Sequence, residues 1–256
     1  MSALHHCLFL LSVALLFVAP SATLAVSPVP IAFGTTWDSP ANSLQNVVDA
    51  YLGGPGLVTV TTDYIGADAG DPDPIFWIDD EFPALLVREV AGYQNSNTLG
   101  WYQETFSMPV IDGLDDGVVF AGSVAAGGTT IVTLPGGVQN FGFYLNPNGT
   151  GDSQNAPEPE LFFTNRFYHD AGPSGAGAIH APFDGDVQAI VFDVSAWKGA
   201  NTFLVCFEDL DSGAPVAPCC TGSDNDFNDL VFEVKALGAT PAEKLSFGGL
   251  KARYRR

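Results

Sequence analysis

The sequence predicts an all-β fold, a β-sandwich or jelly roll with one short peripheral helix. First, 28 glycines and 18 prolines divide the 256 residues into short segments, and none of them shows a sustained helical repeat. Second, short runs rich in Val, Ile, Phe and Thr recur between turn residues, which is typical of sandwiches and jelly rolls. These expected strands are 57–62, 83–92, 117–124, 129–134, 140–146, 160–167, 187–194, 202–210 and 229–237.

Side-chain alternation supports the strand prediction. In 187–194, one face would carry Val187, Ala189, Val191 and Asp193, and the other Ile190, Phe192 and Val194. The main helical candidate is 39–53, where Ser39 can cap and Pro40 suits the first turn. Its apolar residues fall at helical spacing, so we expect this short amphipathic helix to cover one edge or face of the sandwich.

Three regions are expected along the chain. Residues 1–25 resemble a secretory signal, because the apolar run 7–19 is followed by small residues up to Ala25; a retained N-terminal anchor is the alternative. Residues 26–240 form a single β-sandwich domain, and 241–256 form a basic C-terminal tail. No later segment approaches transmembrane length, so we expect a secreted or cell-surface protein without a membrane span after signal removal.

The charge balance is strongly acidic, with 29 Asp and Glu against 9 Lys and Arg. This excludes nucleic acid as a partner, because a polyanion would be repelled. Divalent cations are the obvious counter-charge; the alternative is that acidity serves solubility alone.

Three cysteines remain after the expected signal: Cys206, Cys219 and Cys220. In an oxidising compartment, Cys206 is expected to form a disulfide with Cys219 or Cys220. A zinc site made of these thiolates is the open alternative.

The stretch GSDNDFNDLVFEV, 222–234, crowds acidic side chains ahead of an expected strand. Asp224, Asp226 and Asn228 stand at alternate positions, so a tight loop could turn their oxygens toward one centre. Calcium takes six to eight such oxygens. An EF-hand is excluded, because Asp229 stands in place of the obligatory Gly and Lys235 in place of the bidentate Glu.

A second group of carboxylates lies upstream, where FLVCFEDL ends in Glu208 and Asp209. If this strand pairs antiparallel with the one that begins at Asp229, its end lies beside the acidic turn. We therefore predict a Ca²⁺ site whose candidate ligands are Glu208, Asp209, Asp224, Asp226, Asn228 and Asp229.

Three other interpretations stay open. The acidic turn could be solvated, or its carboxylates could be the acid/base pair of a secreted glycoside hydrolase. However, the sequence contains no G-x-S-x-G, H-E-x-x-H or P-loop pattern, and we predict no enzymatic activity. A carbohydrate-binding module is the third interpretation, because certain aromatic residues could either form a sugar-binding platform or pack in the core: Trp37, Trp77, Trp101 and Tyr102.

Two motifs carry a family resemblance. The two motifs are CFEDL…GSDNDFNDLVFEV and LLVREVAGYQNSNTLGWYQ (85–103), and the hydrophobic pattern of QNFGFYLN (139–146) agrees with them. The chain resembles the bacterial exported domain of unknown function 4114 family over about 85–240. The cysteine-rich insertion 211–222 departs from the usual connector. The resemblance implies a calcium-binding β-sandwich in secreted or surface-attached bacterial proteins, without established enzymatic activity. By position it implies the same six ligand candidates.

From these observations we expect an exported, non-catalytic calcium-binding β-sandwich with a structural or adhesive role at a surface. Cell-surface or extracellular-matrix glycans or proteins are its expected partners besides calcium.

Overall fold

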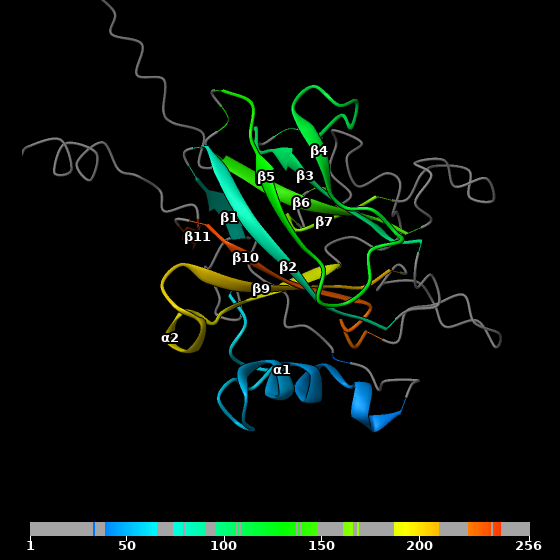
Figure 1. Ribbon diagram of the computed structural model, residues 1–256, viewed down its shortest axis with the longest axis vertical. Helices are drawn as coiled ribbons and strands as arrows, with labels where there is room; N and C mark the ends of the chain where they lie inside the picture. The colour runs from blue at the N-terminus through cyan, green and yellow to red at the C-terminus, as the bar shows by residue number, and fades with distance from the viewer. Residues whose placement is uncertain are drawn as a thin grey trace, which may run out of the picture.

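The protein folds into two antiparallel β-sheets packed face to face, with a helix on the outer face of one of them (Figure 1). The computed structural model describes residues 33, 39–65, 74–78, 80–90, 96–105, 107, 109–136, 138, 140–147, 161–165, 168, 187–209, 225–236 and 238–241. The predicted all-β sandwich is thereby confirmed. The expected signal at 1–25 and the tail beyond Pro241 lie outside the described residues.

Sheet A has the strand order β11-β1-β6-β3-β4, with β7 pairing beside β6. Its strands are β1 (Pro74–Trp77), β3 (Thr98–Gln103), β4 (Asp116–Phe120), β6 (Asn140–Asn146), β7 (Phe162–Phe163) and β11 (Gly238–Pro241). Sheet B has the order β5-β2-β10-β9-β8. Its strands are β2 (Glu81–Glu89), β5 (Thr129–Thr133), β8 (Ala189–Asp193), β9 (Thr202–Phe207) and β10 (Leu230–Lys235).

The main core lies between the two sheets and is rich in phenylalanine. The ring of Phe143 on β6 lies 5.0 Å from Phe76 in its own sheet, and 5.6 Å and 4.8 Å from Phe82 and Phe232 in sheet B. Edge-to-face ring pairs at these separations add to the stability that burial alone provides. Phe143 therefore joins the two sheets near the centre of the sandwich.

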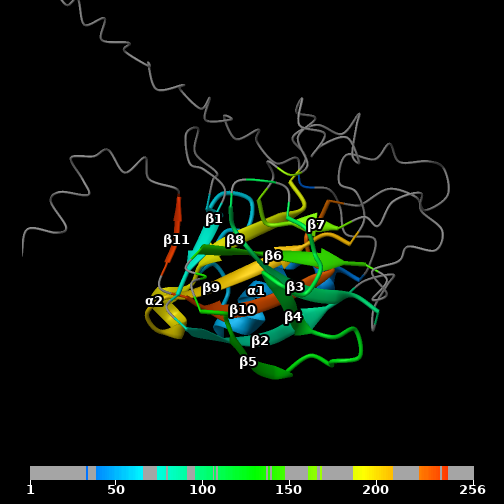
Figure 2. The same ribbon diagram turned by 90° about the horizontal axis from the view of Figure 1, so that it is seen from above.

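A helical segment covers the outer face of sheet B (Figures 1 and 2). The predicted helix 39–53 forms as η1 (Pro40–Asn42) followed by α1 (Leu44–Leu52), and each is capped by a serine hydroxyl, from Ser39 and Ser43. Both faces of sheet B are thus covered, which explains why all six residues of β9 are buried. A second short helix, α2 (Ser195–Lys198), links β8 to β9.

The predicted strand at 57–62 is wrong, because this segment forms turns. Its backbone forms hydrogen bonds with a side chain and not with a neighbouring strand. The amide of Gln45 on α1 donates to the carbonyl of Val58 (2.8 Å) and accepts from the N–H of Val60 (3.1 Å). Val58 and Val60 then pack under α1, so their hydrophobicity serves the helix and not a sheet.

Three strands of sheet A were not expected. β1 lies in a Pro- and Gly-rich region, and β3 in the motif 85–103. β11 pairs with β1 from Trp77 opposite Gly238 to Pro74 opposite Pro241. As the outermost strand of its sheet, β11 tolerates Pro241, because one of its edges needs no ladder hydrogen bond.

The expected disulfide of Cys206 is wrong. Cys206 is a free thiol in the middle of β9, and its side chain is fully buried under α1. Burial raises the pKa of this thiol well above its usual value. Cys219 and Cys220 lie outside the described residues.

We therefore expect Cys206 to resist alkylation in the folded protein and to react only after unfolding, because the reagent needs an accessible thiolate. Peptide mass spectrometry after iodoacetamide treatment, with and without denaturant, measures this. Rapid labelling of Cys206 under native conditions would contradict its burial.

Candidate metal centre

The site lies where the two central strands of sheet B meet the acidic turn. β9 and β10 pair antiparallel as predicted, and their register at this end joins Phe207 to Leu230. Glu208 directly follows β9 and Asp229 directly precedes β10. The sheet is continued here by hydrogen bonds from the N–H of Glu208 to the carbonyl of Gln188 (3.0 Å) and from the N–H of Val90 to the carbonyl of Asp229 (3.0 Å).

The turn before β10 has an unusual backbone. Asn225 and Phe227 have φ of 53° and 56°, in the left-handed region that non-glycine residues rarely adopt. The N–H of Phe227 donates to Oε1 of Glu208 (2.5 Å). The Phe227 ring is buried and lies 5.6 Å from that of Phe33, so its packing holds the residue in this conformation.

The other carboxylates of the site also accept hydrogen bonds. Oδ2 of Asp229 accepts from the backbone N–H of Asp209 (2.8 Å), which ties the two strand ends together. Asp226 accepts from the backbone N–H of Asn228 (3.2 Å) and, with its other oxygen, from the Asn228 side chain (2.5 Å). The Asn228 amide also donates to the carbonyl of Asn42, at the end of η1 (3.0 Å).

These acidic side chains are buried. The exposed fractions are 0% for Glu208, 3% for Asp209, 6% for Asp226 and 8% for Asp229. The alternative of a solvated turn is therefore wrong for this part of the cluster. We use the name acidic cluster for these four residues. Asp224, the remaining carboxylate predicted as a ligand, lies outside the described residues.

The electrostatics of the acidic cluster are dominated by like charge. Burial raises the pKa of Asp229 well above its usual value, and the carboxylates of Glu208, Asp209 and Asp226 raise it further. The backbone N–H of Asp209 opposes this shift. Such a cluster binds either protons or a cation in preference to remaining fully charged.

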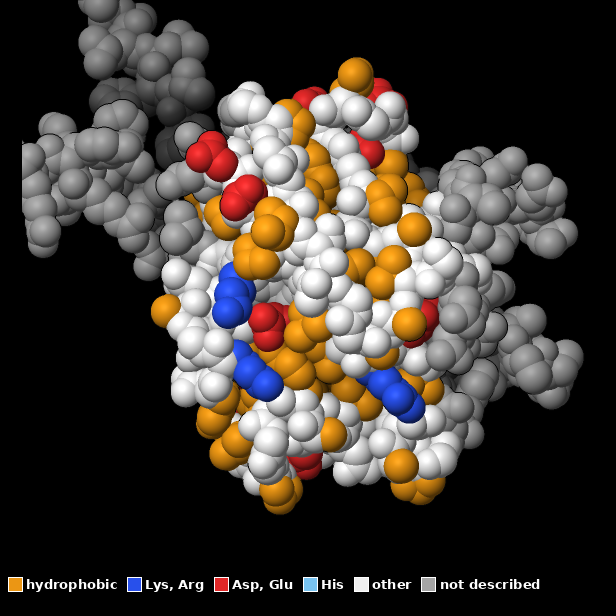
Figure 3. Space-filling view, in the orientation of Figure 1, with side chains coloured by type: hydrophobic (Ala, Val, Ile, Leu, Met, Phe, Trp, Pro, Cys, Tyr) orange, Lys and Arg blue, Asp and Glu red, His pale blue; other side chains and the backbone are white. Residues whose placement is uncertain are grey.

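Two basic side chains in the described part of the chain contact groups other than these carboxylates. Arg88 donates to Oδ1 of Asn42 (2.9 Å), and the Lys198 ammonium lies 3.8 Å from the centre of the Tyr51 ring. On the face seen in Figure 3, basic side chains lie over sheet B and the helical segment, and acidic ones are scattered. The charge of the acidic cluster is thus held inside the fold and not displayed as a surface patch.

The donor chemistry of the site fits a hard cation such as Ca²⁺, since it consists of carboxylate and amide oxygens. As described, each carboxylate points at an N–H donor, and within the described ranges no three Asp, Glu, His or Cys side chains converge as a metal site. Binding a cation would require carboxylates to exchange these donors for the ion. Asn228 would also have to turn, because its amide nitrogen now serves Asp226 and Asn42.

One polar residue of the site was not predicted. Asn97, directly before β3 of sheet A, donates from its side-chain nitrogen to Oδ2 of Asp209 (3.1 Å) and is 2% exposed. It lies in the motif 85–103, the second stretch that carries the family resemblance. The sequence did hold a signal for Asn97: two polar motifs far apart in the chain both carry the family resemblance, which is a reason to ask whether they meet in the fold.

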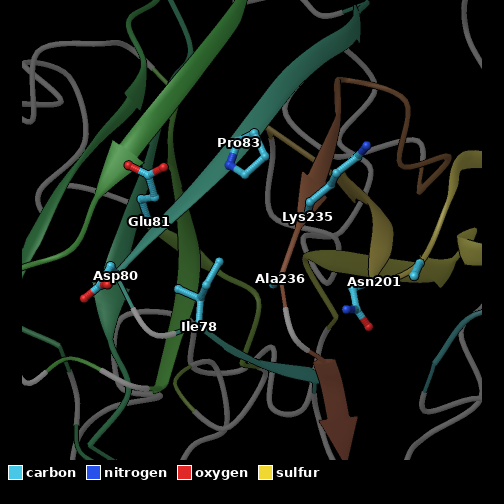
Figure 4. A pocket seen from close by; sticks show the side chains of 8 residues that line it. Ile78, Asp80, Glu81, Pro83, Asn201, Lys235 and Ala236 are labelled. Carbon is cyan, nitrogen blue, oxygen red and sulfur yellow. The ribbon is translucent and has the colours of Figure 1, made fainter.

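An open pocket of about 390 Å³ lies at the other end of β10, away from the acidic cluster (Figure 4). Asp80 and Glu81 line one side and Lys235 and Asn201 the other. Of the aromatic residues considered for sugar binding, Trp101 and Tyr102 are buried and Trp77 is half-buried. Trp37 lies outside the described residues.

In the described part of the chain, no helix is both long and apolar enough to cross a bilayer. In a comparison with protein families, the family described as "Domain of unknown function (DUF4114)" matches residues 134–237. This supports the resemblance over the acidic cluster and the β9–β10 hairpin, but the match leaves out 85–103. No curated protein and no solved structure matches the chain.

Proposed function

We propose that this protein is an exported, non-catalytic calcium-binding β-sandwich with a structural or adhesive role at a surface. The observation that carries the calcium proposal is the acidic cluster itself, in which four carboxylates are less than a tenth exposed and three of them raise the pKa of the fourth, Asp229. Burying charge of one sign is costly unless a counter-charge accompanies it. A divalent cation supplies that counter-charge.

The position of the acidic cluster supports a structural role for the ion. Its residues follow β9 and precede β10, the two strands that form the middle of sheet B together with β2. A cation held there would tie the strand ends together and neutralise their repulsion. Export is proposed from the sequence of residues 1–25, and the surface role from the family resemblance over the same hairpin.

We expect calcium to raise the melting temperature of the purified protein. A ligand that binds only the folded state stabilises it by about 2.7 kcal/mol at 100 times its Kd. For a domain of this size each kcal/mol corresponds to about 2–4 °C, so the rise should be about 5–10 °C. Differential scanning calorimetry in CaCl₂ and in EDTA, at matched ionic strength, measures it.

Magnesium at the same concentration is the control, because its preference for a tight octahedral shell suits this buried carboxylate set less well. It should give a much smaller rise. Equal melting temperatures in calcium and EDTA would sink the calcium proposal.

A further inference from the structure

The amide oxygen of Asn97 is a buried acceptor without a hydrogen-bond partner. Three other side-chain atoms in the described part of the chain share this property: Trp77 Nε1, Tyr102 Oη and Asn140 Oδ1. Leaving such a group unsatisfied destabilises the folded state, so each calls for an explanation. Asn97 differs from the other three in its second polar atom: its amide nitrogen donates a hydrogen bond to Asp209, a member of the acidic cluster.

We propose that Asn97 Oδ1 is a ligand of the cation held by the acidic cluster, a role that rests on the calcium function proposed above. The amide nitrogen of Asn97 lies 3.1 Å from Asp209 Oδ2, so the unpartnered oxygen belongs to an amide group that already contacts the acidic cluster. Ionised carboxylates and an amide oxygen cannot hydrogen-bond one another, because all of them are acceptors. A cation satisfies the carboxylates and the amide oxygen at once.

Charge balance favours a neutral ligand at this position. The acidic cluster contributes up to four negative charges, already more than one Ca²⁺ neutralises. Calcium still needs six to eight oxygens, and an amide adds one without adding repulsion. Asn97 therefore raises the coordination number where a further carboxylate would raise the pKa of its neighbours.

The location of Asn97 gives this ligand a structural consequence. Asn97 directly precedes β3 in sheet A, whereas Asp209 and Asp229 flank β9 and β10 in sheet B. An ion bound by both groups would bridge the two sheets at this end of the sandwich. Calcium would then stabilise the packing of the sheets as well as the β9–β10 hairpin.

The test combines calcium titration calorimetry with Tb³⁺ luminescence, whose lifetimes in H₂O and D₂O report the number of waters on the ion. Asn97→Ala should weaken calcium binding at least about tenfold and leave one additional water on the bound ion. Asn97→Asp keeps an oxygen at the position, so it should retain the water number of the wild type. It should also lower the melting temperature in EDTA, because it adds a carboxylate to the acidic cluster.

Asn140→Ala is the matched control. Its Oδ1 is also buried and unpartnered, but Asn140 lies at the opposite end of the β3–β6 ladder, beyond Phe141, which pairs with Gln103. This variant should bind calcium as the wild type does. An Asn97→Ala variant with unchanged affinity would overturn the inference and leave the calcium proposal intact.

Weaker binding with an unchanged water number in Asn97→Ala would also overturn it, because Asn97 would then only position Asp209. If Asn97→Ala does not fold, Asn97→Asp decides: an additional water in that variant contradicts an oxygen ligand. A wild-type protein that binds neither calcium nor terbium would instead refute the proposed function itself.

Discussion

Replacing Asp229 by asparagine is expected to raise the melting temperature of the protein in EDTA and to remove about half or more of the rise caused by calcium. The two effects share one cause. The Asp229 carboxyl is buried beside three other carboxylates, which raise its pKa. An asparagine oxygen can still accept the hydrogen bond from the Asp209 N–H, so the strand ends stay joined.

The expected gain in EDTA is at least about 2 °C, and the expected loss of calcium affinity is at least about tenfold, or 1.4 kcal/mol. Calorimetry of the variant in EDTA and in CaCl₂ measures both. Asp115→Asn is the matched control, since Asp115 is an exposed carboxylate near β4 and its loss should change neither value. A variant that is less stable in EDTA yet responds fully to calcium would contradict the role of Asp229.

The same substitution should remove a pH dependence. Because the pKa of Asp229 is higher in the folded protein than in the unfolded chain, the folded state keeps a proton that the unfolded chain has lost, from about pH 4 up to that raised value. Calcium-free stability should fall with pH over this window, and calcium affinity should rise, because the ion no longer competes with a proton. Asp229→Asn should flatten both profiles.

Replacing Phe143 by alanine is expected to produce the largest loss of stability. Its ring contacts Phe76 and Phe141 in sheet A and Phe82 and Phe232 in sheet B, so alanine would leave a cavity between the sheets. Such truncations cost about 3–5 kcal/mol. For this size of domain, that corresponds to a melting temperature lower by about 6–20 °C.

Thermal unfolding followed by circular dichroism measures the effect. Ile131→Ala is the control, because Ile131 on β5 is 65% exposed and its loss should cost little. If Phe143→Ala does not fold, Phe143→Leu should show a smaller decrease in the same direction. An effect of Phe143→Ala no larger than that of Ile131→Ala would contradict the central position of the ring.

Local patterns predicted much of this fold because their causes are local. The short apolar runs became strands of both sheets, and helical spacing of Leu44, Val47 and Val48 produced α1. The hairpin of β9 and β10 also followed from the order of the two strands along the chain. Where a distant group replaced the expected partner, local patterns were wrong: Gln45 holds the backbone of 57–62, which forms no strand.

The sequence showed which residue types make up the candidate site, but not whether those residues are buried or exposed to water. GSDNDFNDLVFEV shows that carboxylates are concentrated before a strand, and FLVCFEDL supplies two more. Neither shows whether water or protein surrounds them. The contact of Asn228 with Asn42 of η1 and the burial of Phe227, Asp226 and Asp229 arise only when folding brings distant segments together.

The sequence by itself therefore determined the all-β class, the helix and the oxygen-rich chemistry of the acidic turn, because propensity, periodicity and residue type act over a few neighbouring residues. Tertiary structure alone decided that Cys206 lies buried as a free thiol, that the acidic cluster is enclosed and that Asn97 joins it. Asn97 and Asp209 are 112 residues apart. Contact over that distance depends on how two sheets pack, and no local pattern encodes it.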